Sequence, residues 1–227
     1  APPPRLDPER PGVVIAGPWR GLSPALAPYQ QAVRRWLNAS GWPVLADPLA
    51  ALAAECPNRI EHWELQLDRL NLSADAQVLR LGPMPASRRL EAWLQRHQGP
   101  QLLITEGDPR PLDPLRCASQ WSGGLAAWIA QQPVLDQATK PSVEADDLSR
   151  WIEAQLPLSG AVNEPALAYW LPQLLPEPLP VMLAASSPVR DWLTWGGSAC
   201  GRHRCRGVRR GAGPATGRRR RRGASSR

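Results

Sequence analysis

The sequence predicts an α/β fold in which parallel strands alternate with helices, from residue 12 to about residue 195. Short apolar runs closed by glycine or a polar residue recur along this stretch, and residues with helical apolar spacing lie between them. The apolar fraction of 43% is sufficient for a core. Alternation of this kind favours a parallel sheet with helices on both faces, in which ligands gather beyond the carboxyl ends of the strands.

Each expected strand is a short apolar run, and the first is GVVIAG at residues 12–17. Such a run, closed by glycine, is typical of a buried parallel strand that leads into a turn. Each expected helix carries apolar residues three, four or seven positions apart, and most of the 11 tryptophans fall on these apolar faces. The strands are expected at residues 12–17, 42–47, 77–82, 101–105 and 180–185, and the helices at residues 26–37, 60–70, 87–94, 125–129, 143–156 and 165–175.

The two ends of the chain depart from this pattern. Residues 1–11 hold five prolines and are expected to form an extended linker. Residues 198–227 hold 11 arginines and no acidic residue, so the net charge of +7 for the whole chain leaves −4 for residues 1–197. The tail alternates Gly, Arg and Ala without apolar periodicity, and we expect it to be disordered and to lie outside the fold.

Composition disfavours several classes of protein. No apolar run approaches the ~20 residues of a membrane span, and the proline-rich, charged start is unlike a secretory leader. The four cysteines have no disulfide-framework spacing, which favours a reducing, cytoplasmic compartment. Cys200, His203 and Cys205 fit no common zinc spacing, so we expect no metal site there.

A first candidate site follows the strand at residues 77–82. Ser87 opens the next helix, whose free N–H groups favour anions, and Arg88 and Arg89 add donors suited to carboxylate or phosphate. The alternative interpretation is an ordinary helix start with solvated arginines. Glu106–Arg110 follows another strand, but no GxGxxG or Walker pattern accompanies it, and we expect a turn.

A second candidate site follows the strand at residues 180–185. Ser186 places a hydroxyl just past this strand, and Arg190 lies four residues further on, at a spacing that could hold an acidic ligand. Alternatively, Arg190 and Asp191 form a surface pair near the start of a helix. The local pattern leaves both alternatives open.

Taken together, these segments resemble one family, the MenD or 2-succinyl-5-enolpyruvyl-6-hydroxy-3-cyclohexene-1-carboxylate synthases, which are thiamine-diphosphate enzymes. The resemblance covers roughly residues 10–195, and its motifs are GVVIAG, GWPVLADPL, LRLGPMPASRRL, RPLDP and SSPVRDW in that order. Enzymes of this family have three domains. The resemblance implies that residues 12–160 form the middle, Rossmann-like domain and that residues 161–197 begin the pyrophosphate-binding domain.

The resemblance also implies an activity and substrate-binding residues. The family decarboxylates 2-oxoglutarate on thiamine diphosphate with Mg²⁺ and adds the product to isochorismate, in menaquinone or phylloquinone biosynthesis. Arg88 and Arg89 match its basic pair, with Arg88 in the place of Lys. Ser186 and Arg190 match the ends of its Ser-Met-Pro-Ile-Arg motif. These positions face the two substrates in the family, and both substrates are dicarboxylates that arginine can bind in bidentate fashion.

The sequence departs from the family at the cofactor. No segment matches the catalytic glutamate region or the Gly-Asp-Gly…Asn metal and diphosphate motif, so this chain alone is expected to be inactive. Only Arg210–Ala212 matches the family after Trp195, and a frameshift near residues 196–213 in a GC-rich gene would account for the tail. A homo-oligomer is expected for the full-length enzyme.

Two rival hypotheses belong to other classes of protein. The first is a non-enzymatic binding module whose basic tail, with Arg218–Arg222 in a row, contacts nucleic acid through phosphates. It is disfavoured because the tail has no interleaved aromatic residues and no recognisable binding motif. The second is a stand-alone nucleotide-binding domain, which is disfavoured because no phosphate loop is visible.

Overall fold

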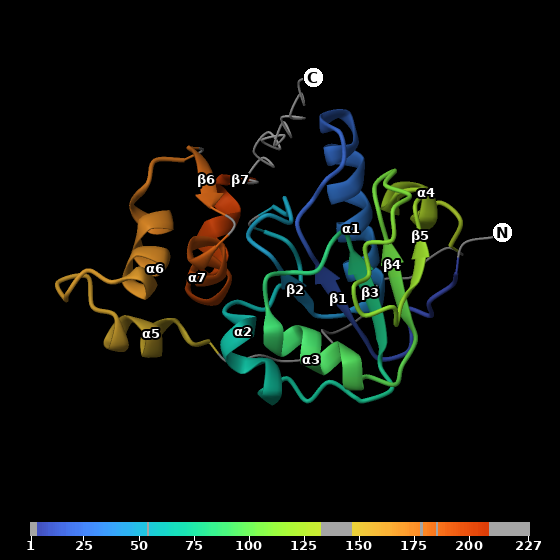
Figure 1. Ribbon diagram of the computed structural model, residues 1–227, viewed down its shortest axis with the longest axis horizontal. Coiled ribbons are helices and arrows are strands. Elements are labelled where there is room, and N and C mark those ends of the chain that lie inside the picture. The colour runs from blue at the N-terminus through green and yellow to red at the C-terminus, as the bar shows by residue number, and fades with distance from the viewer. Residues whose placement is uncertain (1–3, 54, 133–146, 178, 185, 209–227) are drawn as a thin grey trace, which may run out of the picture.

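The computed structural model describes residues 4–53, 55–132, 147–177, 179–184 and 186–208 (Figure 1). In this part of the chain a larger sheet has five parallel strands in the order β2-β1-β3-β4-β5. Its first four strands confirm the sequence prediction, whereas β5 was not expected, because it is short and lacks a buried apolar run. The strands are β1 (Gly12–Ala16), β2 (Val44–Ala46), β3 (Gln77–Leu81), β4 (Gln101–Ile104) and β5 (Ser119–Trp121).

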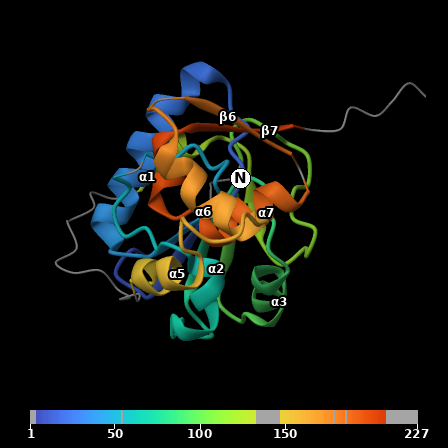
Figure 2. The same cartoon turned by 90° about the vertical axis from the view of Figure 1, so that its left-hand side faces the viewer.

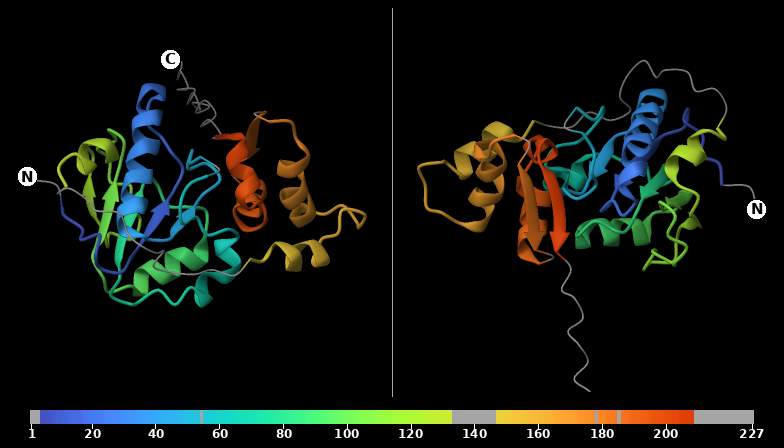
Figure 3. Two further views of the ribbon diagram at one scale, coloured as in Figure 1. Left: turned by 180° about the vertical axis from the view of Figure 1, so that it is seen from behind. Right: turned by 90° about the horizontal axis from the view of Figure 1, so that it is seen from above.

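Helices cover both faces of this sheet, as predicted (Figure 3). The side chains of β1 alternate between two cores: Val14 and Ala16 pack with α1 and α4, whereas Ile15 packs with α2 and α3. All residues of β1 are buried, as is typical of a parallel strand covered on both sides. The elements are α1 (Leu26–Ser40), α2 (Trp63–Gln66), α3 (Arg88–Arg96) and α4 (Leu125–Ile129), with 3₁₀ turns η1 (Ser23–Ala25) and η2 (Leu67–Arg69).

A second, smaller unit lies beside the five-stranded sheet in Figure 1 and faces the viewer in Figure 2. Its two strands, β6 and β7, pair in parallel with each other and not with the larger sheet. Ala168, Leu183 and Trp192 form its core, while Leu193 packs into the core beneath α2 and α3 and so joins the two units. Its elements are α5 (Ser149–Gln155), α6 (Glu164–Leu174), β6 (Pro180–Ala184), α7 (Ser187–Trp195), η3 (Ser198–Arg202) and β7 (Arg204–Val208).

The expectation that the whole of 198–227 is disordered is wrong for residues 198–208. Strand β7 pairs with β6, and the buried Cys200 packs against Trp192. His203 is also buried, and its Nε2 lies 2.7 Å from the carbonyl oxygen of Pro172. A ladder of backbone hydrogen bonds does not depend on side-chain polarity, so an Arg- and Gly-rich segment can form a strand without apolar periodicity. The frameshift hypothesis remains a prediction, and residues 209–227 lie outside the described residues.

Two further expectations concern the linker and the helix before β6. Residues 4–11 contain no helix or strand, as predicted, but Leu6 is buried and the indole N–H of Trp128 donates to the carbonyl oxygen of Pro4. The described part of the linker is therefore packed on the domain. The helix expected at residues 143–156 is observed from Ser149 onward, and residues 143–146 lie outside the described residues.

Candidate functional site

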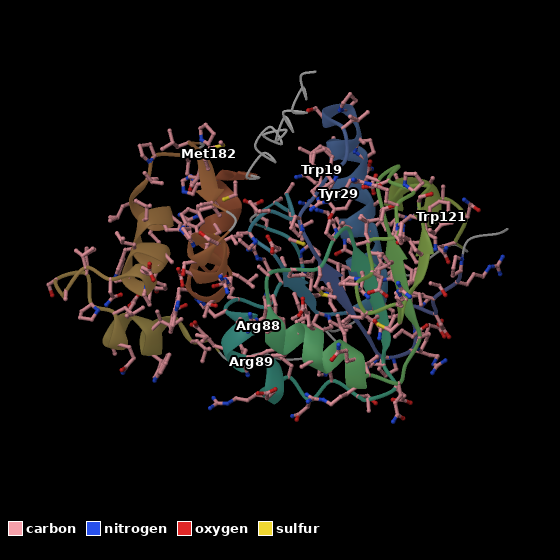
Figure 4. The ribbon with its side chains drawn as sticks, in the orientation of Figure 1. Trp19, Tyr29, Arg88, Arg89, Trp121 and Met182 are labelled. Carbon is pink, nitrogen blue, oxygen red and sulfur yellow. The ribbon has the colours of Figure 1, made fainter. Side chains whose placement is uncertain are left out.

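Ligands of parallel α/β sheets bind beyond the carboxyl ends of the strands, where the strand order reverses. In this sheet the order reverses at β1, which has β2 on one side and β3 on the other. The loops after β1 and β3 touch there: a Cβ on Gly17 would lie 1.6 Å from the carbonyl oxygen of Pro83. Trp19 and Tyr29, whose ring centroids are 6.2 Å apart, line the crevice at this edge (Figure 4). The remaining enclosed space is about 20 Å³, room for about one water, so the described residues form no preformed nucleotide pocket at this edge of the sheet.

The start of α3 is built as the sequence predicted. Ser87 is the N-cap, and its Oγ accepts a hydrogen bond of 3.0 Å from the backbone N–H of Leu90. The same hydroxyl donates to Oε2 of Glu64 at 2.5 Å, which ties the start of α3 to α2. Burial raises the pKa of the Glu64 carboxyl, although the Ser87 hydroxyl and the Arg89 guanidinium oppose this rise.

Arg88 and Arg89 occupy the first turn of α3 but differ in what they contact (Figure 4). The Arg89 guanidinium donates to the backbone carbonyl of Glu64 and pairs with the Asp68 carboxylate at 2.6 Å. Arg88 is exposed and has no hydrogen-bond or ion-pair partner in the described part of the chain. Arg88 is therefore the freer donor for an external anion.

Ser186 and Arg190 lie at the start of α7, and both are exposed. The Arg190 Nε–H donates to the backbone carbonyl of Ser186 at 3.4 Å, and no ion pair joins Arg190 to Asp191 among the described residues. The alternative of a surface pair is therefore not observed. No contact described in the structure joins this pair of residues to Arg88 or Arg89, so the two candidate sites stay on separate helices.

Two buried titratable groups near these helices went unnoticed in the sequence. Asp47 follows β2, and burial raises its pKa to about 6, although the Leu49 N–H that donates to its Oδ1 lowers it. His62 precedes α2, and burial lowers its pKa. An aspartate at the end of a strand was a usable signal, because such positions meet at the ligand-binding edge of a parallel sheet. His62 gave no signal, since its contacts are far away in sequence.

Metal and membrane sites are not apparent in the described residues. No group of three or more His, Cys, Asp or Glu side chains there is arranged to hold a metal ion. Cys200 and Cys205 have free thiols whose pKa values burial raises, so both are structural in character. No helix in the described ranges is long and apolar enough to cross a membrane.

The class of protein follows from a comparison with known families. A family model described as "Middle domain of thiamine pyrophosphate" matches residues 8–180, most of the chain. The chain belongs to this family of middle domains of thiamine pyrophosphate enzymes.

The curated relatives are more specific, and all three described here are 2-succinyl-5-enolpyruvyl-6-hydroxy-3-cyclohexene-1-carboxylate synthases. The protein from Synechococcus sp. (strain CC9605) is 81% identical over 92% of this chain and 37% of its own length. Those from Parasynechococcus marenigrum (strain WH8102) and Prochlorococcus marinus (strain MIT 9313) are 62% and 52% identical over 92% of this chain. These relatives confirm the resemblance to the synthase family. The chain spans less than two fifths of the length of these relatives.

Proposed function

We propose that this chain is the middle segment of a 2-succinyl-5-enolpyruvyl-6-hydroxy-3-cyclohexene-1-carboxylate synthase and supplies part of its substrate-binding surface. The identity of 81% to a named synthase is the main support. The substrates are dicarboxylates, 2-oxoglutarate and isochorismate, and the candidate residues are Arg88, Arg89, Ser186 and Arg190. Carboxylate recognition by arginine agrees with the exposed position of Arg88 and Arg190 at helix starts.

Arg88 and Arg89 take different parts in this proposal. Arg89 is already held by Asp68 and by the backbone of Glu64, so its main contribution is to fix the start of α3. Arg88 projects from the same turn without a described partner, so it is the arginine that contacts a substrate carboxylate.

The cofactor does not fit the residues described here. Thiamine diphosphate is held through a divalent cation, and no group of three or more His, Cys, Asp or Glu side chains in the described residues is arranged to hold a metal ion. The proposal places magnesium and thiamine diphosphate in other segments of the full-length synthase, and no chemical step is assigned to this chain. The proposal also includes a cytoplasmic location, a homo-oligomeric full-length enzyme and a product used for menaquinone or phylloquinone.

An exposed apolar face supports the view that further protein covers the smaller unit. Leu167, Leu171 and Leu174 lie on one side of α6 and are 50%, 38% and 63% exposed. Met182 on β6 is 66% exposed (Figure 4). Parallel strands are normally covered on both faces, and a stripe of leucines on a surface helix is typical of a buried interface. By contrast, no observation on the described residues favours the nucleic-acid module.

Kinetics on a full-length synthase that carries this segment test the proposal. Arg88→Ala and Arg190→Ala should each lower kcat/KM by roughly 10- to 100-fold, because a lost charged hydrogen bond costs about 1.5–3 kcal/mol. Arg96→Ala, an exposed arginine at the other end of α3, is the matched control and should have no effect. The present chain alone, with thiamine diphosphate and Mg²⁺, should show no turnover. Unchanged kinetics in both arginine variants would remove the site assignment, and turnover by the chain alone would refute the partial role.

A further inference from the structure

The segment from Arg59 to Asp68, which contains α2, contacts both of the helices that carry candidate substrate residues. Its last residues hold the start of α3, and its first residues hold the end of α7. The two helices have no described polar contact with each other, so this segment is their link. Figure 1 shows α2 between α7 and the start of α3.

The contact with α7 is made by two nitrogen donors. His62 Nδ1 lies 3.2 Å from the carbonyl oxygen of Thr194, and Arg59 Nη2 donates to the carbonyl oxygen of Gly197 at 3.4 Å. A carbonyl only accepts, so Nδ1 carries the imidazole proton in this hydrogen bond. The last carbonyls of a helix lack intrahelical partners, and a nearby positive charge is favourable there. His62 therefore caps the last turn of α7, and Arg59 holds Gly197, the residue after the C-cap Gly196.

The fit around His62 is tight. Gly197 has φ +55°, and a Cβ at this position would lie 3.0 Å from the His62 ring. Leu193 packs in the same core as Ile60 and Trp63. The void left in this interface is about 10 Å³, no more than one water. Close packing of this kind allows little change in the position of α7.

The contact with α3 is equally well defined. Glu64 accepts from the Ser87 hydroxyl at 2.5 Å, and Asp68 pairs with Arg89 at 2.6 Å. Between the two contacts, His62 adopts a left-handed conformation with φ 48° and ψ 31°, which a residue other than glycine seldom adopts. The left-handed backbone at His62 directs its imidazole toward α7, and the chain then enters α2, whose Glu64 holds the start of α3.

We infer that the Arg59–Asp68 segment is a positioning element that fixes Arg88 on α3 relative to Arg190 on α7. Within it, His62 and Glu64 are positioning residues: they hold α7 and the start of α3, and neither is assigned a contact with substrate. The inference rests on the proposed function, since it assumes that the two arginines serve one dicarboxylate-binding surface. A helix as short as α7 is rigid, so a cap at its last turn also sets the direction of its first turn.

Hydrogen exchange on the full chain tests the structural part. His62→Ala should speed exchange of the α7 amides by about fivefold or more, as expected for loss of one hydrogen bond. Gly197→Ala should also speed this exchange, because its Cβ would meet the His62 ring at 3.0 Å and because φ +55° strains any residue other than glycine. His62→Asn should restore part of the protection, since Asn tolerates left-handed φ and carries an N–H donor. His97→Ala is the matched control, because His97 Nε2 lies 2.5 Å from the Ala76 carbonyl oxygen at the far end of α3. Unchanged α7 exchange in His62→Ala would overturn the inference.

Titration with 2-oxoglutarate, followed by NMR of the arginine side chains, tests the positioning role. The wild-type chain should bind weakly, and His62→Ala and Gly197→Ala should weaken binding at least threefold, whereas His97→Ala leaves it unchanged. Faster α7 exchange with unchanged affinity would overturn the positioning role. No binding by the wild type would overturn the proposed function and with it the role in substrate binding, while the exchange measurement would still decide whether His62 caps α7.

Discussion

Asp47 is a buried carboxyl whose replacement gives a sharp test of the structure. It is 2% exposed, its Oδ1 accepts from the Leu49 N–H at 2.8 Å, and the backbone N–H of Ala86 also favours its charged form. Burial raises its pKa to about 6 from a reference value of 3.8. Asp47→Asn keeps the acceptor to Leu49 and removes the charge, so it should make the chain more stable at neutral pH.

The sign and size of the effect follow from linkage. A raised pKa in the folded state means that folding favours the protonated carboxyl, so wild-type stability from this group is lowest above pH 6 and grows as the pH falls toward 3.8. The full difference corresponds to about 3 kcal/mol, of which about 1.4 kcal/mol appears between pH 7.5 and pH 5. The stability advantage of Asp47→Asn over the wild type should therefore shrink by about 1.4 kcal/mol across this range.

Urea unfolding at pH 7.5, 6.5, 5.8 and 5.0, followed by tryptophan fluorescence, measures this difference. All other titrating groups cancel, because the wild type and the variant share them. Asp75→Asn is the control: this carboxyl is exposed, and its hydrogen bond with Ser73 lowers its pKa, so its replacement should give no trend above pH 5. A difference between Asp47→Asn and the wild type that stays constant with pH would refute the reasoning that burial governs Asp47.

Three further predictions address other parts of the molecule. Asp113→Ala should lower the free energy of unfolding by about 3–5 kcal/mol, because the buried Arg80 guanidinium, 2.8 Å from Asp113, would lose its ion pair. Replacing both partners, with Arg80→Met and Asp113→Asn, should cost much less. Urea unfolding measures both variants. Arg202→Ala should change stability by less than about 1 kcal/mol, since its ion pair is exposed; a larger loss would show that its side chain anchors the segment before β7. Leu167→Gln with Leu171→Gln should reduce self-association of the chain in sedimentation experiments, and unchanged association would show that the exposed face of α6 does not drive it.

Local patterns were sufficient to predict most of the larger unit. The strands β1, β3 and β4 are fully buried, and apart from Gln77, Arg80 and Gln101 their residues are apolar or glycine. Mostly apolar runs are typical of parallel strands covered on both faces and are visible in sequence. The cap at Ser87 was also predictable, because a serine before an apolar helical stretch satisfies a free N–H of the first turn. The position of Arg88 in the first turn of α3 follows from the same local signal.

Other features depended on contacts between distant residues. The strand at β7 is made by pairing with β6, and backbone pairing leaves no mark on the side chains of an Arg- and Gly-rich segment. The difference between Arg88 and Arg89 arises because only Arg89 is within reach of Asp68, 21 residues earlier in the chain. His62 caps a helix that lies 132 residues away.

The sequence by itself determined the α/β class, four strands of the larger sheet, the helices on both faces and the start of the candidate site. These depend on periodicity and on interactions within a few residues. Only the tertiary structure decided which arginine has no described partner, which strands pair with each other, and which titratable groups are buried. Hydrogen bonds, burial and electrostatic interactions between distant segments depend on where the folded chain brings them, and one sequence without its relatives does not record those distances.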